Sequence, residues 1–298
     1  MNTDIIILAA GKGTRMHSSL PKVLQVLGHK PLLQHVIDTC SDIQKSKLHI
    51  VVGDQKELVK KSITAPKNTN WVNQPKQLGT GHAVRQVLKS IRPNACCIVL
   101  YGDGPLVNSN TLKKIINSVK KDSLSLLTFE PQSSKGLGRI IRNNKNQVVG
   151  IVEEKDASPK QKLIGEVNSG IMAALGKSLQ KRVPKIKNNN VAKEYYLTDL
   201  VGLFSADAKK ITAINLGLSN EPLGANDNGE LNHLERAYQK MQAEAFAKKG
   251  IKFADLNRVD FRGEIDTKKN TFIDKKNILE GKVSIGENCK IGSGCVIR

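Results

Sequence analysis

The sequence has few aromatic side chains and no long apolar run, and these absences exclude several classes of protein. Aromatic residues make up 4% of the 298 residues, while the 39% hydrophobic content is ample for a buried core. No stretch approaches the roughly 18 consecutive apolar residues of a membrane span. The N-terminus enters a short apolar segment directly from Met1, without the features of a cleavable leader. We therefore expect a globular, cytoplasmic protein with no membrane partner.

The cysteines and histidines provide neither a disulfide framework nor a metal site. The five cysteines are an odd number and contain no C-x-x-C pair. The six histidines are scattered, and none lies four residues from another, as a metal site on one helical face would prefer. We expect most cysteines to be buried packing residues and no metal centre built from His or Cys.

The net charge of +20 suggests a nucleic-acid partner, because basic surfaces bind phosphate backbones. The distribution of the charge argues against that class. Lysine pairs at 60–61, 113–114 and 120–121 are spread among helical segments, and the few aromatic residues leave little for bases to stack on. We expect solvated lysine-rich faces and no nucleic-acid partner.

Apolar runs that end at glycine-bearing turns predict a parallel sheet. DIIILAAGKG at the N-terminus and CCIVLYGDGPL at residues 96–106 are continuous apolar runs, which are typical of buried parallel strands. Between them, residues 31–40 predict a helix with Pro31 at its first position, and residues 47–54 predict another strand. The alternation indicates a doubly wound α/β sheet.

Ligands of such sheets bind beyond the carboxyl ends of the strands. Gly11, Asp54 and Asp103 each follow the end of a predicted strand. We expect the functional site at that edge.

The C-terminal part of the sequence has a different pattern. One helical stripe, closed by Gly250, predicts a linker helix over residues 230–250. The stripe consists of Leu231, Leu234, Tyr238, Met241 and Ala245. Aliphatic residues then recur at every sixth position, at Ile273, Leu279, Ile285, Ile291 and Ile297, which is the hexapeptide signature of a parallel β-helix. We predict domains at 1–229, 230–250 and 251–298, the last a truncated β-helix.

The stretch LAAGKGTRM at residues 8–16 predicts a phosphate-binding turn, although its spacing matches neither the P-loop nor the complete G-x-G-x-x-G template. Lys22 adds a second cation seven residues after Arg15. Two cations and a row of backbone N–H groups beside a strand end suit a triphosphate.

This stretch, with LPKVL at residues 20–24, resembles the signature of the sugar-nucleotide pyrophosphorylases. Seven further motifs follow in that family's order: QPKQLGTGHA (74–83), YGDGPL (101–106), GLGRIIR (136–142), GIVEEKDA (150–157), EVNSGI (166–171), EYYLTDL (194–200) and GAND (224–227). Together they resemble the bacterial bifunctional family that joins N-acetylglucosamine-1-phosphate uridyltransferase to glucosamine-1-phosphate N-acetyltransferase. The resemblance covers essentially the whole chain. It implies a Rossmann-like domain with a mixed, mostly parallel sheet, a linker helix and the first coils of a left-handed β-helix.

The resemblance also implies the roles of particular residues. Those matching the substrate-binding positions are Leu8, Ala9, Ala10, Gly11, Lys22, Gln74, Gly79, Thr80, Tyr101, Gly102, Asp103, Gly138, Glu153, Asn168 and Asn226. Arg15, Lys22 and Asp103 match the catalytic positions, and Asp103 and Asn226 match the ligands of Mg²⁺, the implied cofactor. Gln74 with Gly79 and Thr80 would read uracil, and Gly138, Glu153 and Asn168 would bind the sugar. Taken alone, Asp103 is equally well a helix cap, Glu153 a solvated charge and Gln74 ordinary loop polarity. We expect Tyr195 and Tyr196 to be structural.

The implied activity is that of a UDP-N-acetylglucosamine diphosphorylase. UTP and N-acetylglucosamine-1-phosphate would give UDP-N-acetylglucosamine, a precursor of peptidoglycan and lipopolysaccharide, and pyrophosphate. Acetyl transfer uses later coils in this family, so we expect it to be absent from this chain. Full-length members form homotrimers, but the short β-helix leaves the oligomeric state of this chain open. A nucleotidyltransferase for another sugar phosphate and a non-catalytic assembly or regulatory protein remain alternatives.

Overall fold

The computed structural model describes residues 1–11 and 13–298, with Lys12 outside the described residues. These residues divide into two compact units. The first comprises Met1–Thr14, Ser18–Leu24 and Leu32–Leu223, and the second comprises Arg15–His17, Gln25–Pro31 and Gly224–Arg298. The domain boundaries expected from the sequence remain predictions.

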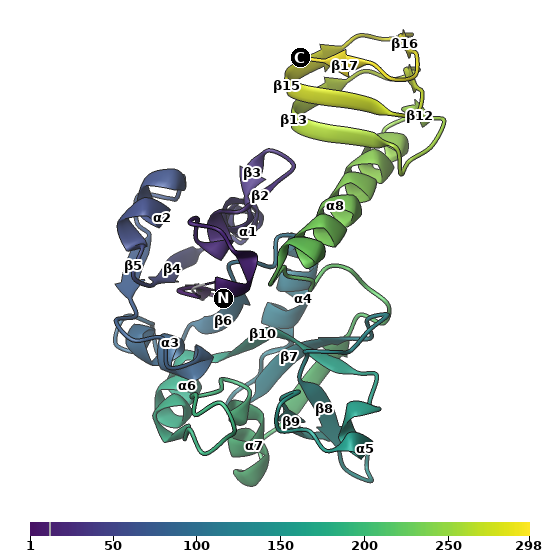
Figure 1. The fold of residues 1–298 in the computed structure, drawn as a ribbon. Coiled ribbons are helices and arrows are strands. Elements are labelled where there is room, and N and C mark those ends of the chain that lie inside the picture. The colour runs from purple at the N-terminus through teal and green to yellow at the C-terminus, as the bar shows by residue number, and fades with distance from the viewer. Residues whose placement is uncertain (12) are drawn as a thin grey trace. The chain divides into compact units, whose positions relative to one another are not determined.

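The first unit is built on a mixed sheet in which nine described strands are arranged around the central order β11-β7-β10-β6-β1-β4-β5, with β8 and β9 attached beside β10 (Figure 1). The strands are β1 (Thr3–Ala9), β4 (Ser46–Val52), β5 (Asn70–Asn73), β6 (Cys96–Tyr101), β7 (Leu124–Phe129), β8 (Arg139–Arg142), β9 (Val148–Val152), β10 (Val167–Leu175) and β11 (Ile211–Asn215). Strands β5, β4, β1 and β6 run parallel, as do β7 and β11, whereas β10 is antiparallel to both β6 and β7. The expected mixed, mostly parallel α/β sheet is confirmed.

The helical elements of this unit connect the strands. They are α1 (Leu32–Ser41), α2 (Lys56–Ser62), α3 (Thr80–Val87), α4 (Ser109–Ser118), α5 (Pro159–Lys162), α6 (Gly176–Arg182) and α7 (Asp199–Ala206), with 3₁₀ turns η2 (Lys22–Leu24) and η3 (Val183–Lys185). A third 3₁₀ turn, η1 (Thr14–Met16), crosses from the first unit into the second.

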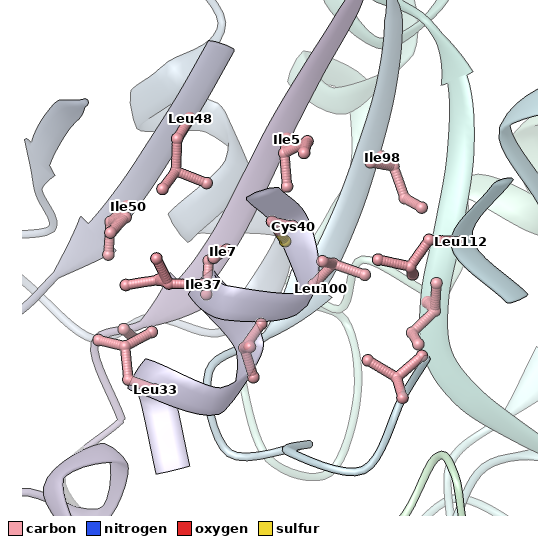
Figure 2. Packing of buried hydrophobic residues seen from close by; sticks show 14 of the residues in the cluster. Ile5, Ile7, Leu33, Ile37, Cys40, Leu48, Ile50, Ile98, Leu100 and Leu112 are labelled. Carbon is pink, nitrogen blue, oxygen red and sulfur yellow. The ribbon is translucent and has the colours of Figure 1, made fainter. Parts of the chain in front are cut away.

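Strand β1 separates two hydrophobic cores because its side chains alternate between the faces of the sheet. Ile5 and Ile7 belong to one core, which includes the apolar faces of α1, α2 and α4. Ile6 and Leu8 belong to the other, which includes α3, α6 and α7. Figure 2 shows the first core, where side chains of α1 lie over the central strands. Burial on both faces explains why the strand sequence is apolar at every position from 5 to 8.

Pro31 does not begin the helix predicted for residues 31–40. It lies in the short strand β3 (Lys30–Pro31), paired with Val26 of β2 (Val26–Leu27), and α1 begins one residue later at Leu32. A two-stranded ribbon accepts proline because an edge position does not require its missing N–H group. The error is one residue at the boundary, and the helix itself is confirmed.

The second unit contains the long helix α8 (Asn228–Lys248), with Asp227 as its N-cap and a backbone bond from Gly250 N–H to Ala247 O at 2.9 Å near its C-terminal end. The predicted apolar stripe is wrong in its second half, because Met241 and Ala245 are exposed. Leu234, Tyr238, Gln239 and Ala243 are buried instead. The Gln239 amide accepts a bond from Phe261 N–H at 2.6 Å and donates to Phe261 O at 3.1 Å. The sequence analysis did not predict this polar contact, because the helical stripe was defined by apolar residues alone.

The C-terminal residues form the coils that the hexapeptide pattern predicts. Their strands are β12 (Lys252–Phe253), β13 (Val259–Thr267), β14 (Phe272–Ile273), β15 (Asn277–Ile285), β16 (Lys290–Ile291) and β17 (Val296–Ile297). Strands β13, β15 and β17 pair in parallel, and each partner lies 18 residues further along the chain, from 259 to 277 and from 278 to 296 (Figure 1). One coil is therefore three hexapeptides. Four of the five periodic aliphatics are buried, at Ile273, Leu279, Ile285 and Ile291, and Ile297 packs against them.

Gly263 is required where β13 meets β15. A Cβ built on it would lie 1.8 Å from the carbonyl oxygen of Gly281, its register partner. We expect Gly263→Ala to destabilise the coils by about 1–3 kcal/mol, because the strands must separate to accept a methyl group. Gly292→Ala is the matched control, since nothing lies within 4 Å of that Cβ position. Limited proteolysis followed by mass spectrometry should show faster cleavage within residues 251–298 for the first variant alone; equal rates would contradict the expectation.

No helix in the described part of the chain is long and apolar enough to span a membrane.

Candidate active site

The predicted nucleotide loop lies at the carboxyl end of β1. Leu8 and Ala9 end the strand, and Ala10 follows; all three are buried. Gly11 is exposed, and nothing lies within 4 Å of the position that a Cβ would occupy. The N–H of Gly102 donates to Leu8 O at 2.9 Å, which fixes the end of β6 beside the end of β1. A ligand can therefore approach the backbone directly at Gly11.

Lys22 and Asp103 form an ion pair at this edge between Nζ and Oδ2, and each side chain is 16% exposed. Asp103 follows the end of β6, and Lys22 begins η2. Gly13 has a positive φ of 62°, and a Cβ built on it would lie 2.6 Å from Cβ of Lys22. The second glycine of the loop is therefore needed for the close approach of Lys22, and the structure places a cation and a carboxylate together beside the loop.

Gln74 lies on the turn formed by residues 74–80, called the Gln74 turn below. Its side chain is 3% exposed, and its Nε2 group donates to Gly79 O at 3.2 Å and lies 3.0 Å from Nδ1 of His82. Its backbone N–H donates to Val52 O at 2.8 Å, at the end of the neighbouring strand β4. Gly79 adopts a φ of 103° immediately before Thr80 begins α3. The amide of Gln74 is thus held at the carboxyl edge, where it can present hydrogen-bonding atoms to a planar base.

Tyr101 ends β6, and its ring packs against Gly170 of β10. A Cβ at Gly170 would lie 1.9 Å from Cε2 of the ring, and Gly170 has a positive φ of 82°. Burial raises the pKa of the Tyr101 phenol, aided by the negative charges of Glu153 and Asp103. The hydroxyl therefore stays neutral and shares a hydrogen bond with Thr80.

Gly138, Glu153 and Asn168 lie around the antiparallel part of the sheet. The N–H of Asn168 donates to Gly138 O at 2.8 Å, and a Cβ on Gly138 would lie 3.2 Å from Oε2 of Glu153. Glu153 accepts a hydrogen bond from the Thr198 hydroxyl at 2.8 Å. Asn168 is 8% exposed, and its Oδ1 atom has no hydrogen-bond partner among the described residues. A buried amide oxygen without a partner favours a ligand that donates to it.

Burial raises the pKa of the Glu153 carboxyl above its ordinary value, and nearby Asp199, Asp156 and Glu194 add to the rise. The hydrogen bond from Thr198 acts in the opposite direction. The site therefore surrounds Glu153 with negative charge.

Two predicted residues belong to the second unit. Arg15 lies in η1 and is exposed. Asn226 precedes α8, where its N–H donates to Glu230 Oε2 at 2.7 Å and its Nδ2 group donates to the same atom at 3.0 Å. The roles of Arg15 and Asn226 alongside Asp103 remain predictions.

The donor set tests the predicted magnesium site. The described residues contain no group of three or more His, Cys, Asp or Glu side chains that could hold a metal ion. Asp103 therefore offers a single hard carboxylate. This fits Mg²⁺, which keeps waters and takes phosphate oxygens as ligands, and it does not fit an ion that needs a full protein cage.

Three residues outside the predicted set shape the site: Gly13, Gly170 and Thr198. The two glycines stand in sequence motifs that predict the site, yet the pattern does not reveal which side chain needs their missing Cβ. Thr198 stands in EYYLTDL, a motif without an assigned chemistry. Contacts between residues far apart in the sequence assign these roles, and no local pattern encodes them.

Comparison with known proteins agrees with this architecture. Residues 5–182, more than half of the chain, match the MobA-like NTP transferase domain, and residues 267–298 match the bacterial transferase hexapeptide (six repeats). The chain is 44% identical over all its 298 residues to the Bifunctional protein GlmU of Nitrosococcus oceani, and it spans 66% of the length of that relative. The resemblance predicted from the motifs is confirmed. The chain belongs to the MobA-like NTP transferase family and carries a hexapeptide-repeat segment after its transferase domain.

Proposed function

We propose that the chain transfers UMP from UTP to N-acetylglucosamine-1-phosphate, with Mg²⁺ as cofactor, and releases pyrophosphate and UDP-N-acetylglucosamine. The observation that carries the proposal is the Lys22–Asp103 ion pair beside the exposed backbone of Gly11. The pair brings together a cation suited to binding phosphate and a carboxylate suited to binding a metal ion. It supports the proposal because both lie at the carboxyl edge of the sheet, where ligands of such folds bind. The family match supports nucleotidyl transfer as the class of reaction.

The proposed reaction needs no general base, because the attacking phosphate oxygen is already anionic. It attacks the α-phosphorus of UTP in line, forms the new P–O bond and expels pyrophosphate. The chain must hold two anions together and neutralise their charge. Lys22 would bind phosphate oxygens at the reacting centre, Arg15 would bind the triphosphate, and Gly11 would offer its backbone N–H.

Asp103 and Asn226 would hold the magnesium ion. When bound, the ion supplies charge neutralisation at the phosphates and helps to orient them. In the described structure, Lys22 holds the Asp103 carboxylate in place. We infer that Lys22 turns to the phosphates when they bind and leaves the carboxylate to the metal.

The two substrates would be read on opposite sides of β6. Gln74, Gly79 and Thr80 lie on the side of the parallel strands, and their amide and backbone groups would read uracil. Glu153 and Asn168 lie on the side of β10, where a carboxylate can accept from sugar hydroxyls and the buried Oδ1 of Asn168 can accept from a hydroxyl or an acetamido N–H. The polar groups on both sides support a sugar nucleotide as the product.

A different sugar phosphate is the second candidate, because Glu153 and Asn168 would also bind other hydroxyl-rich sugars. If Asn168 Oδ1 reads the acetamido N–H, glucose-1-phosphate leaves this buried oxygen without its donor, which costs about 1–3 kcal/mol. On that assignment we expect pyrophosphate release to be at least about tenfold faster, in kcat/KM, with N-acetylglucosamine-1-phosphate than with glucose-1-phosphate; equal rates would mean that Asn168 accepts from a hydroxyl. Galactose-1-phosphate and the nucleotides ATP, CTP and GTP complete the panel.

The same assay tests the proposal itself. Pyrophosphate release from UTP and N-acetylglucosamine-1-phosphate should require Mg²⁺ and stop with EDTA. If pyrophosphate is released only with another sugar phosphate, that sugar phosphate is the substrate and the proposed specificity for N-acetylglucosamine-1-phosphate is wrong. No release with any pair would favour a non-catalytic assembly or regulatory protein.

A further inference from the structure

Residues 195–198, called the bridging segment below, contact both the Gln74 turn and Glu153. At one end, Tyr195 N–H donates to Leu78 O at 2.8 Å, and Gly81 N–H donates to Tyr195 O at 2.7 Å. At the other end, the Thr198 hydroxyl donates to Oε1 of Glu153 at 2.8 Å. Four consecutive residues therefore join the proposed uracil-reading turn to the proposed sugar-reading carboxylate.

The contact at the Gln74 turn is close. Cβ atoms built on Gly79 and Gly81 would lie 2.7 Å and 2.9 Å from the carbonyl oxygen of Tyr195. The guanidinium of Arg85 lies 4.6 Å from the centre of the Tyr195 ring and donates to Ile186 O at 3.1 Å. Tyr195 is therefore held on both sides, by the backbone of the turn and by a cation over its ring.

The middle of the bridging segment is anchored to Thr80. Leu197 N–H donates to the Thr80 hydroxyl oxygen at 3.0 Å, and Leu197 is 1% exposed. Thr198, the next residue, is 4% exposed and immediately precedes α7. The backbone of Thr198 is therefore held on both sides, by the bond from Leu197 N–H to Thr80 and by α7, which begins at Asp199.

Glu153 needs such a donor. It lies among Asp156, Glu194 and Asp199, with the phenols of Tyr101 and Tyr196 also close enough to be affected by its charge. These neighbours supply negative charge or neutral hydroxyls. Within the described part of the chain, the hydrogen bond that stabilises the Glu153 carboxylate comes from the Thr198 hydroxyl, at 2.8 Å. Without that bond, the carboxylate would lose a partner that stabilises its ionised form and fixes its rotamer.

We infer that Thr198 is a positioning residue for sugar recognition and that the bridging segment sets its hydroxyl from the Gln74 turn. The inference rests on the proposed function and deepens it. The Thr198 hydroxyl holds the Glu153 carboxylate ionised and oriented toward sugar hydroxyls, and the Thr80 anchor makes sugar binding depend on the turn that reads the base.

The first test compares Thr198→Val, Thr198→Ser and a matched control, Thr69→Val, whose hydroxyl is buried but has no hydrogen-bond partner among the described residues. Thr198→Val should raise KM for N-acetylglucosamine-1-phosphate about tenfold, because a hydrogen bond to a charged group is lost. KM for UTP should stay within about twofold, and Thr198→Ser, which keeps the hydroxyl, should restore the sugar KM.

The pH profile separates positioning from a packing defect. Burial raises the pKa of Glu153, and the bond from Thr198 lowers it. Removing the bond should move the acidic limb of kcat/KM for the sugar phosphate to higher pH, because the ionised carboxylate is needed to accept sugar hydroxyls. Titration of the Glu153 carboxyl by ¹³C NMR in the ligand-free protein should show the same upward shift, with no shift for Thr69→Val.

The second test concerns the anchor. Thr80→Val removes the acceptor for Leu197 N–H and should raise KM for both substrates, whereas Thr80→Ser should restore the KM for the sugar phosphate. A Thr80→Val variant that changes the KM for UTP alone would overturn the link to the Gln74 turn.

The outcomes distinguish the two claims. A wild-type chain that releases no pyrophosphate refutes the proposed function, while the NMR titration still tests the Thr198–Glu153 bond. An active wild type with unchanged sugar KM, pH profile and Glu153 titration in Thr198→Val refutes the positioning role alone. Equal rises in both KM values for Thr198→Val would also refute it, since that pattern indicates general loss of structure.

Discussion

Replacing Asp103 by alanine should lower kcat for pyrophosphate release by about 10³-fold, because charge stabilisation at the transferring phosphates is lost. Asp103 is the proposed protein carboxylate for Mg²⁺, and the described residues offer no acidic cluster that could take its place. The fold should survive the change, since the side chain lies at a strand end and is partly exposed. A steady-state assay with a thermal unfolding scan measures both effects.

The control for this variant is Asp42→Ala, an exposed aspartate directly after α1. It removes the same charge away from the carboxyl edge and should leave kcat within about twofold of the wild type, as expected for a surface substitution. Normal turnover in Asp103→Ala would refute the metal-binding assignment. A large fall in thermal stability for Asp103→Ala would mean that the Lys22–Asp103 ion pair supports the fold as well as the reaction.

Replacing Gly170 by alanine should lower the free energy of unfolding by about 2–5 kcal/mol, by adding an overpacked methyl group and an unfavourable backbone conformation. The new Cβ would lie 1.9 Å from the Tyr101 ring, and the φ of 82° is one that side chains rarely adopt. Such a loss is a large fraction of the roughly 5–15 kcal/mol that stabilises a typical domain. Urea unfolding followed by circular dichroism should show an earlier midpoint.

Gly150→Ala is the matched control for Gly170→Ala. Gly150 lies in β9, nothing lies within 4 Å of its Cβ position, and its φ is not positive. The free energy of unfolding of the Gly150→Ala variant should differ from that of the wild type by less than about 1 kcal/mol. Equal stability of the two variants would show that β10 and β6 adjust to the added methyl group without cost, and would remove Gly170 as the reason for the position of Tyr101.

The sequence predicts the parallel half of the sheet well because one local rule governs it. Ile5 to Leu8 are apolar without interruption, and a strand with helices on both faces requires this pattern. The hexapeptide coils are equally predictable. Ile273 and Leu279 lie six residues apart, and three such hexapeptides make one coil of 18 residues. In both cases, which side chains are buried can be read from the order of apolar residues, as an unbroken run in the strand and as a six-residue repeat in the coils.

The antiparallel placement of β10 is not visible in the residues themselves. Its burial is continuous, as in a parallel strand, so only the family resemblance predicts a mixed sheet. The polar contact of Gln239 with Phe261 was missed for a related reason, because an apolar stripe cannot reveal a buried amide that bonds to a distant backbone.

Some residues of the candidate site are likewise predictable from local sequence patterns, and others are not. The glycines and the cation of the N-terminal loop predict a phosphate site by their chemistry, and Asp103 follows a strand end that the pattern also predicts. The residues proposed to bind the sugar come from the resemblance alone, because Glu153 stands in a charged run with no local signature. Thr198 could not be found from sequence, since its role depends on a carboxylate 45 positions earlier in the chain.

The reversed direction of β10 has a consequence for engineering. Because β10 runs against β6, its first residues, including Asn168, reach the same edge as the last residues of β6. The β8–β9 hairpin attaches there through the pairing of Arg139 with Val167. Residues 136–170 thus bring the three residues proposed to bind the sugar, Gly138, Glu153 and Asn168, to that edge in one continuous segment. On the proposed function, a directed-evolution library confined to that segment would change the residues around the sugar while the sequences of the loop at Gly11 and of the Gln74 turn stay as they are.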